Sequence, residues 1–420
     1  MLPNLNLSHM DLNVNRKLKK IVFLFLVLLS PLALFGQKKQ IAQANEYIKS
    51  HKNLDKAEKV LSGLLNDSVS RNNSKVWLLL HEALLGQYEQ GNEKVYLKQK
   101  CDTVGLFSLA SKLFRCDIAF DSLEMRLQEN NRLKIKHRQK HAEYLHAIRP
   151  NLFNAGAFYI KKAEYRKAID FFEQYIDCAK QPLFSFYQYA KKDALMPHAG
   201  YWAMYCGYKL GDADLIMRYA PLAEQDTSML NFVRQYEASA FLIKKDTVQY
   251  VNALKKGFDK YPNFAYFFPR LMEYYVRNGE LENAMKVADR ALSIDSTSVL
   301  FRFAKSTVLL NSGKYDECID LCKQLISERD TMADAYYNIG LAYFNQAISL
   351  DKVRQRSAST RKKLTKFYEQ SLPYMEKVRQ LEPDKKELWL YPLYTIYLNL
   401  NMGKEFDEID KIKNEYRNHH

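Results

Sequence analysis

The sequence of 420 residues is poor in the residues that interrupt helices, with only 14 glycines and 11 prolines. It also lacks long stretches in which Val, Ile or Thr alternate with polar residues, the pattern of a half-buried strand. Leu, Lys, Glu, Ala and Tyr are abundant instead, which favours helices joined by short turns. We therefore predict an all-α chain, long enough for two or three domains or for one array of small repeats.

Sequence motifs typical of enzymes are also missing. The chain has no HExxH, no glycine-rich phosphate-binding loop, no GxSxG and no CxxC, and these are the patterns that place nucleophiles, metals or phosphates. Scattered acids such as Glu273 cannot be paired into a catalytic dyad by spacing. We therefore expect a protein that is not an enzyme and that uses no cofactor.

His137 and His141 are four residues apart, so both could reach one metal ion from the same face of a helix. No third ligand is suitably spaced nearby, and five Lys or Arg side chains between Arg132 and Lys140 would repel a cation. We therefore interpret this segment as a solvated basic helix and predict no metal site.

The N-terminus contains an apolar run too short to span a membrane. Four basic residues between Arg16 and Lys20 precede the run from Ile21 to Phe35, whereas a spanning helix needs about 20 apolar residues. A basic head, a short apolar run and a small residue indicate a secretory signal peptide over residues 1–36. We expect an exported protein, periplasmic or secreted. Because no cysteine lies near the cleavage point, we expect no stable membrane anchor after cleavage.

The charge is strongly basic, with a formal net charge of +15. Such an excess attracts nucleic acid, anionic lipid or an acidic protein. Since we expect export, nucleic acid is not the expected partner, and an acidic protein or peptide is.

A 34-residue period organises the chain from about Gln235 to Phe344. Gly279 recurs as Gly313, and Ala284 and Ala288 recur as Cys318 and Cys322. Because alanine fills the cysteine positions one period earlier, we interpret both cysteines as buried, unpaired packing residues.

Three segments resemble the tetratricopeptide repeat (TPR) family, whose pattern places aromatic, small and apolar residues at fixed positions of a helical hairpin. In "YYNIGLAYF" the matching residues are Tyr336, Ile339, Gly340 and Tyr343. In "LFNAGAFYIKKAEYRKAIDFF" they are Leu152, Ala155, Gly156, Tyr159, Tyr165, Ala168 and Phe172, and in the segment from Phe268 to Leu292 they are Phe268, Leu271, Tyr275, Gly279, Ala284 and Ala291.

The resemblance implies a right-handed α-solenoid of TPR-like helical hairpins. We expect degenerate helical repeats at 37–149, TPR repeats at 150–384 with a basic insertion near 351–366, and capping helices at 385–420. Two interpretations of the insertion stay open: longer helices with a solvated surface, or a protruding surface for an acidic partner. In this family the first helix of each hairpin lines a peptide-binding groove. By position, that groove would contain Phe153, Lys161, Glu273, Arg277, Thr307, Asn311, Tyr337 and Asn345.

Six Asp-Ser or Asp-Thr pairs, each followed by an apolar residue or Thr, resemble the O-glycosylation sequon of exported Bacteroidetes proteins, and the Phe-Gly-Gln sequence at the end of the signal peptide resembles signal peptides of that group. Glycans would then be attached to Ser68, Thr103, Ser122, Thr247, Ser296 or Thr331. The same residue types are also preferred helix caps, so capping is the alternative interpretation.

Together these patterns predict a non-catalytic scaffold or adaptor that binds a protein or peptide in the bacterial cell envelope. The alternative is a surface glycan-binding protein with the same type of fold.

Overall fold

The structure is a computed structural model that describes residues 36–129, 135–352 and 357–419. Within these ranges every regular element is a helix and no strand occurs, which confirms the predicted fold class. The predicted signal peptide lies, apart from Gly36, outside the described residues.

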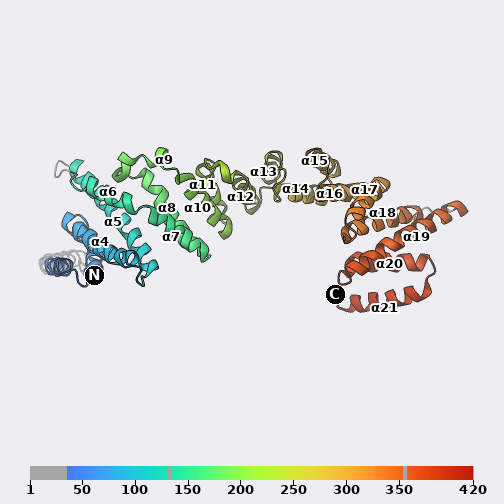
Figure 1. The fold of residues 1–420 in the computed structure, drawn as a ribbon, viewed down its shortest axis with the longest axis horizontal. Helices are drawn as coiled ribbons and strands as arrows, with labels where there is room; N and C mark the ends of the chain where they lie inside the picture. The colour runs from blue at the N-terminus through green and yellow to red at the C-terminus, as the bar shows by residue number, and fades with distance from the viewer. Residues whose placement is uncertain (1–35, 130–134, 353–356, 420) are drawn as a thin grey trace, which may run out of the picture. The chain divides into compact units, whose positions relative to one another are not determined.

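The chain divides into two compact units, the first ending at Ile243 and the second beginning at Lys244. In the first unit a helix at 36–49 is followed by α2 (Leu54–Leu64), α3 (Ser68–Arg71), α4 (Ser74–Tyr96), α5 (Thr103–Glu129), α6 (Arg138–Ile148), α7 (Pro150–Lys161), α8 (Tyr165–Asp177), α9 (Tyr189–Lys192), α10 (Met196–Leu210), α11 (Ala213–Ala223) and α12 (Leu230–Ile243). The second unit contains α13 (Thr247–Lys260), α14 (Phe267–Arg277), α15 (Leu281–Ile294), α16 (Val299–Asn311), α17 (Tyr315–Glu328), α18 (Ala333–Asp351), α19 (Ala358–Leu381), α20 (Lys386–Asn399) and α21 (Gly403–His419) (Figure 1).

Consecutive helices form hairpins that pack on one another. In the first unit α7 packs on α8 and α10 on α11, and α8 also packs on α10. In the second unit α14 packs on α15, α16 on α17 and α18 on α19, while α15 contacts α16 and α17 contacts α18. One hairpin has an apolar face that it cannot bury alone, so the next hairpin must cover it.

The turns of the hairpins keep the 34-residue period. Gly211, Lys245, Gly279 and Gly313 follow one another at this interval, and all four have positive φ values, of 67°, 58°, 72° and 72°. Glycine adopts this left-handed conformation without steric cost, so it is the natural residue for ending the first helix. The turns thus show the period from Gly211, earlier than the start at about Gln235 that the sequence pattern indicated. The sequence pattern did not show this because Lys245 occupies the position at which the other three turns have glycine.

Small residues hold the helices of a hairpin close together. Ala168 is fully buried, and a methyl group added to Gly156 would lie 2.6 Å from the ring of Phe172. One added to Gly340 would lie 2.9 Å from Met375. These are the small positions of the TPR pattern, and each lies where a larger side chain would push two helices apart.

Cys318 and Cys322 are fully buried, and neither forms a disulfide. They belong to a core cluster with Leu309, Leu325 and Ile339. The interpretation of these cysteines as packing residues is therefore confirmed.

The basic insertion lengthens both helices of its hairpin. α18 has 19 residues and α19 has 24, whereas α16 and α17 of the preceding hairpin have 13 and 14. Residues 353–356 lie outside the described part of the chain. The described part of the predicted C-terminal segment, 385–419, contains the hairpin of α20 and α21.

We expect Gly156→Ala to lower the free energy of unfolding by about 1–3 kcal/mol, the usual cost of inserting a methyl group into a packed core. Urea denaturation followed by circular dichroism measures the change. Gly63→Ala is the matched control, because Gly63 lies in helix α2 with no atom within 4 Å of the added methyl. It should be neutral or stabilising by up to about 1 kcal/mol. Equal effects of the two substitutions would contradict the close packing of α7 and α8.

Candidate functional site

In the second unit the first helices of successive hairpins form a continuous layer. α14 contacts α16, α16 contacts α18 and α18 contacts α20. Arg277, Asn311 and Asn345 are 34 residues apart and therefore occupy the same position of three successive helices. Arg277 and Asn311 are exposed, and Asn345 is partly exposed. The layer thus carries a column of three polar side chains, which we call the polar column.

The adjacent column of predicted groove residues includes side chains that hold the layer together. Glu273 is exposed, but Thr307 is half-buried and accepts a hydrogen bond of 3.3 Å from the amide of Asn338. Asn338 also donates to the fully buried Ser306, at 3.1 Å. The amide of Asn338 links α18 to α16, a role that the sequence pattern did not predict. Thr307 therefore has a structural role whether or not it meets a partner.

Tyr337, another predicted groove residue, is only partly exposed and packs against the core cluster around Trp389. Burial, together with the negative charge of Glu387, raises the pKa of its hydroxyl. The phenol therefore stays protonated and can donate a hydrogen bond at the edge of the layer.

The two predicted groove residues of the first unit both lie on α7. Lys161 is exposed at its C-terminal end. Phe153 is partly buried, with its ring 5.4 Å from that of Phe172, 5.7 Å from that of Tyr175 and 6.1 Å from that of His198. Phe153 thus contributes to the packing of α7 on α8 and α10, whereas Lys161 faces solvent.

The six predicted glycosylation residues are all exposed, namely Ser68, Thr103, Ser122, Thr247, Ser296 and Thr331. Several of the preceding aspartates are caps. Asp67 accepts from the backbone N–H of Ser70, and Asp246 from that of Gln249. Asp121 is different, because it lies inside α5 and pairs with Arg138 at 2.7 Å. Helix capping thus accounts for part of the pattern, and exposure leaves every hydroxyl accessible.

An insertion between α8 and α10 was not recognised in the sequence. The left-handed residue Ala163 precedes Gly211 by 48 residues instead of 34. The extra chain forms two 3₁₀ turns, Cys178–Lys180 and Pro182–Tyr187, followed by α9. The second turn, α9 and the neighbouring helices line an open cavity of about 460 Å³, whose lining includes His146, Arg149, Tyr187, Tyr189, Lys192 and Asp193.

Arg149 holds this insertion in place. Its guanidinium lies between the rings of Tyr175 and Tyr189, 3.6 and 3.8 Å from their centroids, and its Nη1 is 2.6 Å from Asp193 Oδ2. Burial alone would raise the pKa of Asp193, but the hydrogen bonds from Arg149 and Tyr175 outweigh it and lower the pKa below its usual value. The carboxylate is therefore charged at neutral pH and forms a buried ion pair.

Aromatic side chains extend from this cavity to the surface. The ring of Tyr187 stacks on that of His146 with centroids 4.0 Å apart, and on that of Tyr189 at 5.5 Å. The adjacent Phe186 is 87% exposed. The first unit therefore combines an exposed aromatic residue with a lined cavity.

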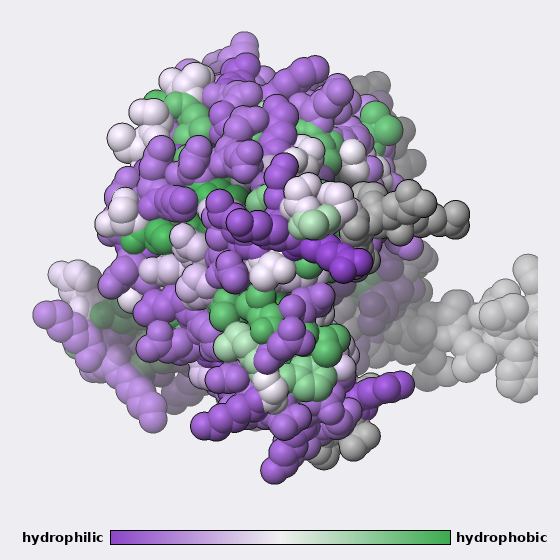
Figure 2. Space-filling view, turned by 90° about the vertical axis from the view of Figure 1, so that its right-hand side faces the viewer, coloured by the Kyte–Doolittle hydropathy of each residue, from purple (hydrophilic) through white to green (hydrophobic). Residues whose placement is uncertain are grey.

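The face drawn in Figure 2 is the side at the right of Figure 1. Hydrophilic side chains dominate this face, and hydrophobic patches lie between them.

A second feature of the first unit is a row of buried acids on α5. Asp117, Asp121 and Glu124 follow one another at helical spacing, and all three are buried. Glu124 Oε1 lies 2.8 Å from His137 Nδ1, and Asp121 pairs with Arg138. The start of α6 thus contacts two of these acids inside the protein, and Arg138 forms an ion pair with Asp121.

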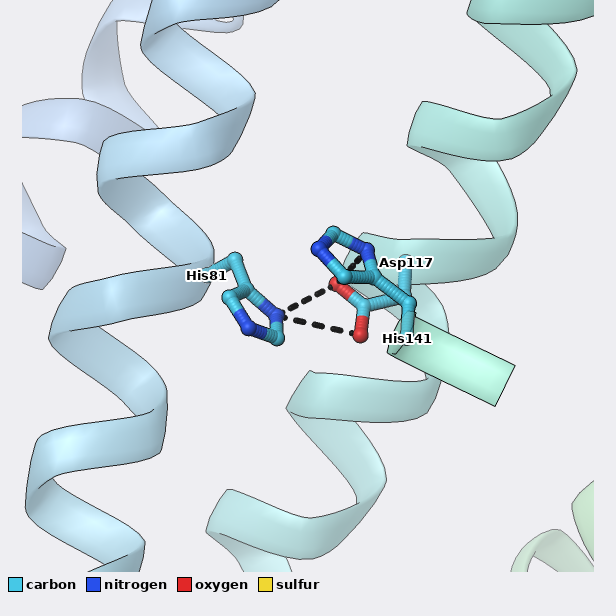
Figure 3. Close-up of side chains that lie close together, drawn as sticks. All are labelled: His81, Asp117 and His141. Carbon is cyan, nitrogen blue, oxygen red and sulfur yellow. Dashed lines mark hydrogen bonds and ion pairs between the residues drawn. The ribbon is translucent and has the colours of Figure 1, made fainter. Parts of the chain in front are cut away.

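Asp117 lies between two histidines. Its Oδ1 is 2.8 Å from His81 Nδ1 and 3.5 Å from His141 Nδ1, and the two imidazoles stack with centroids 4.1 Å apart. Figure 3 shows the three side chains, which come from α4, α5 and α6. Burial lowers the pKa of His141 more than the charge of Asp117 raises it. We call these residues the His-Asp-His cluster.

The interpretation of the segment around His137 as a solvated helix is wrong for His141, which is 5% exposed. The segment was interpreted as a surface because Glu124 and Asp121, which pair with His137 and Arg138, lie 13 and 17 residues earlier in the chain. The spacing of Asp117, Asp121 and Glu124, at i, i+4 and i+7 along one helix, was the available signal.

Among the described residues, no helix is both long and apolar enough to cross a membrane. No protein-family description matches the sequence, and no curated protein is similar to it.

Solved structures with a similar fold include several TPR proteins. One is the C-terminal part of a TPR repeat-containing protein from Cytophaga hutchinsonii, which is 13% identical over 62% of this chain and 93% of that chain, with a TM-score of 0.43. Another is a tetratricopeptide repeat protein from Parabacteroides merdae, which is 14% identical over 60% of this chain and 97% of that chain, with a TM-score of 0.36.

We expect Arg149→Met to destabilise the protein by about 3–5 kcal/mol, because it leaves Asp193 charged and without its cation in a largely buried position. Arg218→Met is the control, since the pair of Arg218 with Glu173 is 3.3 Å long and its arginine is 61% exposed. Exposed pairs contribute about 0–1 kcal/mol. Denaturant unfolding measures both variants, and equal losses would show that the Arg149 pair has no special role.

Proposed function

We propose that this chain is an exported, non-catalytic scaffold of the bacterial cell envelope that binds an extended protein segment along the layer of first helices. The observation that carries this proposal is the polar column of Arg277, Asn311 and Asn345 on α14, α16 and α18. The signal-peptide pattern of residues 1–36 supports export.

The spacing of the polar column suits an extended peptide. Packed helices lie about 8–10 Å apart, and an extended chain rises about 3.3 Å per residue. Successive side chains of the column would therefore meet about every third residue of a bound strand. Each asparagine amide offers both donors and an acceptor. Asn311 donates to the carbonyl of Thr307 at 2.8 Å, which fixes its side chain without using its oxygen.

The charge of the column and of the chain favours an acidic partner. Arg277 presents a guanidinium that can bind a carboxylate in two hydrogen bonds. The formal net charge of +15 adds a long-range attraction. We infer that acidic residues of the partner lie beside α14 and that its backbone crosses α16 and α18.

We expect the double variant Arg277→Ala with Asn311→Ala to weaken partner binding tenfold or more, since a neutral hydrogen bond contributes about 1 kcal/mol and a charged one about 1.5–3 kcal/mol. Binding is measured by capture from a bacterial envelope extract, with quantitative mass spectrometry of the retained proteins. The matched control is Lys286→Ala with Gln324→Ala, which removes a basic and an amide side chain from exposed positions of α15 and α17. If the two double variants retain the same proteins in the same amounts, the polar column is not the binding surface.

A second candidate function is glycan binding at the cavity beside the α8–α10 insertion. The cavity has the size of a small-molecule site, and it combines aromatic faces with Arg149, Lys192 and Asp193 as polar groups. Stacked aromatic rings that project from a rigid element offer flat apolar faces to a sugar ring.

If glycans bind there, Tyr187→Ala should abolish retention of labelled envelope polysaccharide on the immobilised protein, because it removes the ring stacked on His146. Tyr96→Ala removes an equally accessible tyrosine, 85% exposed, from the end of α4 and should leave retention unchanged. Absence of polysaccharide binding by the unmodified protein would exclude this second function.

A further inference from the structure

We propose that the His-Asp-His cluster is a binding site for one divalent transition-metal ion, with Nδ1 of His81, a carboxylate oxygen of Asp117 and Nδ1 of His141 as the protein ligands. The three ligand atoms lie within 4.8 Å of one another, and they come from three different helices (Figure 3).

The distances from Asp117 to the two histidines are compatible with a bound metal ion as well as with hydrogen bonds. Ligand atoms about 2.0–2.1 Å from a tetrahedral Zn²⁺ ion are about 3.3 Å apart. The two observed separations, 2.8 Å from Asp117 to His81 and 3.5 Å from Asp117 to His141, lie on either side of this value. The longer one exceeds the normal N–H···O range of about 2.7–3.2 Å. Because the two imidazoles stack with an interplanar angle of 10°, at least one ring must rotate before both nitrogens can face one ion.

The electrostatic situation of Asp117 favours a cation. Its side chain is fully buried, and in the described part of the chain no lysine or arginine pairs with it. Asp121 has Arg138 as its partner, whereas Asp117 has two imidazoles. A buried carboxylate needs a compensating cation or hydrogen-bond donors. A divalent ion would neutralise it and bind the nitrogen of each imidazole at the same time.

Imidazole and carboxylate ligands select the class of metal. Two nitrogens and one oxygen suit Zn²⁺, Co²⁺ or Fe²⁺, whereas Ca²⁺ and Mg²⁺ prefer oxygen ligands throughout. With three protein ligands the fourth position of the ion is left for water.

The site would join parts of the first unit that the repeat pattern does not hold together. His81 precedes Asp117 by 36 residues, and His141 follows it by 24. α4 and α5 have 23 and 27 residues, well beyond the 13 and 14 residues of α16 and α17. A metal ion bound by α4, α5 and α6 therefore acts as a cross-link in the segment where consensus packing is weakest. This inference differs from the sequence-based expectation of no metal site, and it does not depend on the proposed partner binding.

Metal binding is tested on the purified protein after removal of ions with EDTA. Titration with Zn²⁺ followed by calorimetry should show one ion per chain, and titration with Co²⁺ should give a visible absorption band of a four- or five-coordinate ion. Zn²⁺ should also raise Tm, because it binds the folded state. A protein that binds neither ion at micromolar concentration, or whose Tm does not change, would overturn the proposal.

Two variants and a matched control locate the site. His81→Gln removes a ligand. Loss of an outer-shell partner weakens metal binding by about 10- to 100-fold, so loss of this ligand should weaken Zn²⁺ binding by more than that. Asp117→Asn keeps an acceptor for His81 and removes the charge, so it should fold and should lose the Zn²⁺-dependent rise in Tm. His198→Gln is the control, since His198 also pairs with a carboxylate, Asp226, at 2.9 Å. If His198→Gln weakens binding as much as Asp117→Asn does, the ion is bound elsewhere.

Discussion

The structure depends on the close approach of paired helices at small residues. Where Gly156 faces Phe172, or Gly340 faces Met375, there is no room for a side chain larger than hydrogen. This closeness lets aromatic and aliphatic side chains fill the space between one hairpin and the next. Since a single hairpin cannot bury its own apolar face, stability comes from the stack, and each hairpin is held by its neighbours.

The packing of the stack also determines which surface positions remain available for binding. The buried faces of both helices of each hairpin are used for packing. The outer positions of the first helices remain available, and they recur along one layer. In the second unit these positions form the polar column, in which Arg277 and Asn311 lie one period apart. Some groove positions also have a structural role. Thr307 accepts a hydrogen bond from Asn338, and this bond joins α16 to α18. Binding and packing thus share one helix face.

The two features of the first unit that depart from the repeat have different physical origins. The insertion between α8 and α10 is held by a buried ion pair and by the aromatic rings around Arg149. The His-Asp-His cluster lies where long helices replace the repeat, and there polar side chains fill the interior. In both places buried charged side chains fill part of the interior that apolar side chains fill in the regular hairpins. Such positions are where repeat proteins acquire individual chemistry.

The sequence by itself determined the period, the all-helical class and the buried positions of Cys318 and Cys322, because a packing pattern that recurs every 34 residues is a local property of each hairpin. It also indicated which first-helix positions repeat at the surface. Only the tertiary structure decided that His141 is buried beside Asp117 and His81, and that Arg149 meets Asp193 across an insertion. These contacts join residues at irregular separations of 24 to 44 positions. The repeat period does not predict such pairs, since they form only when several helices have already packed.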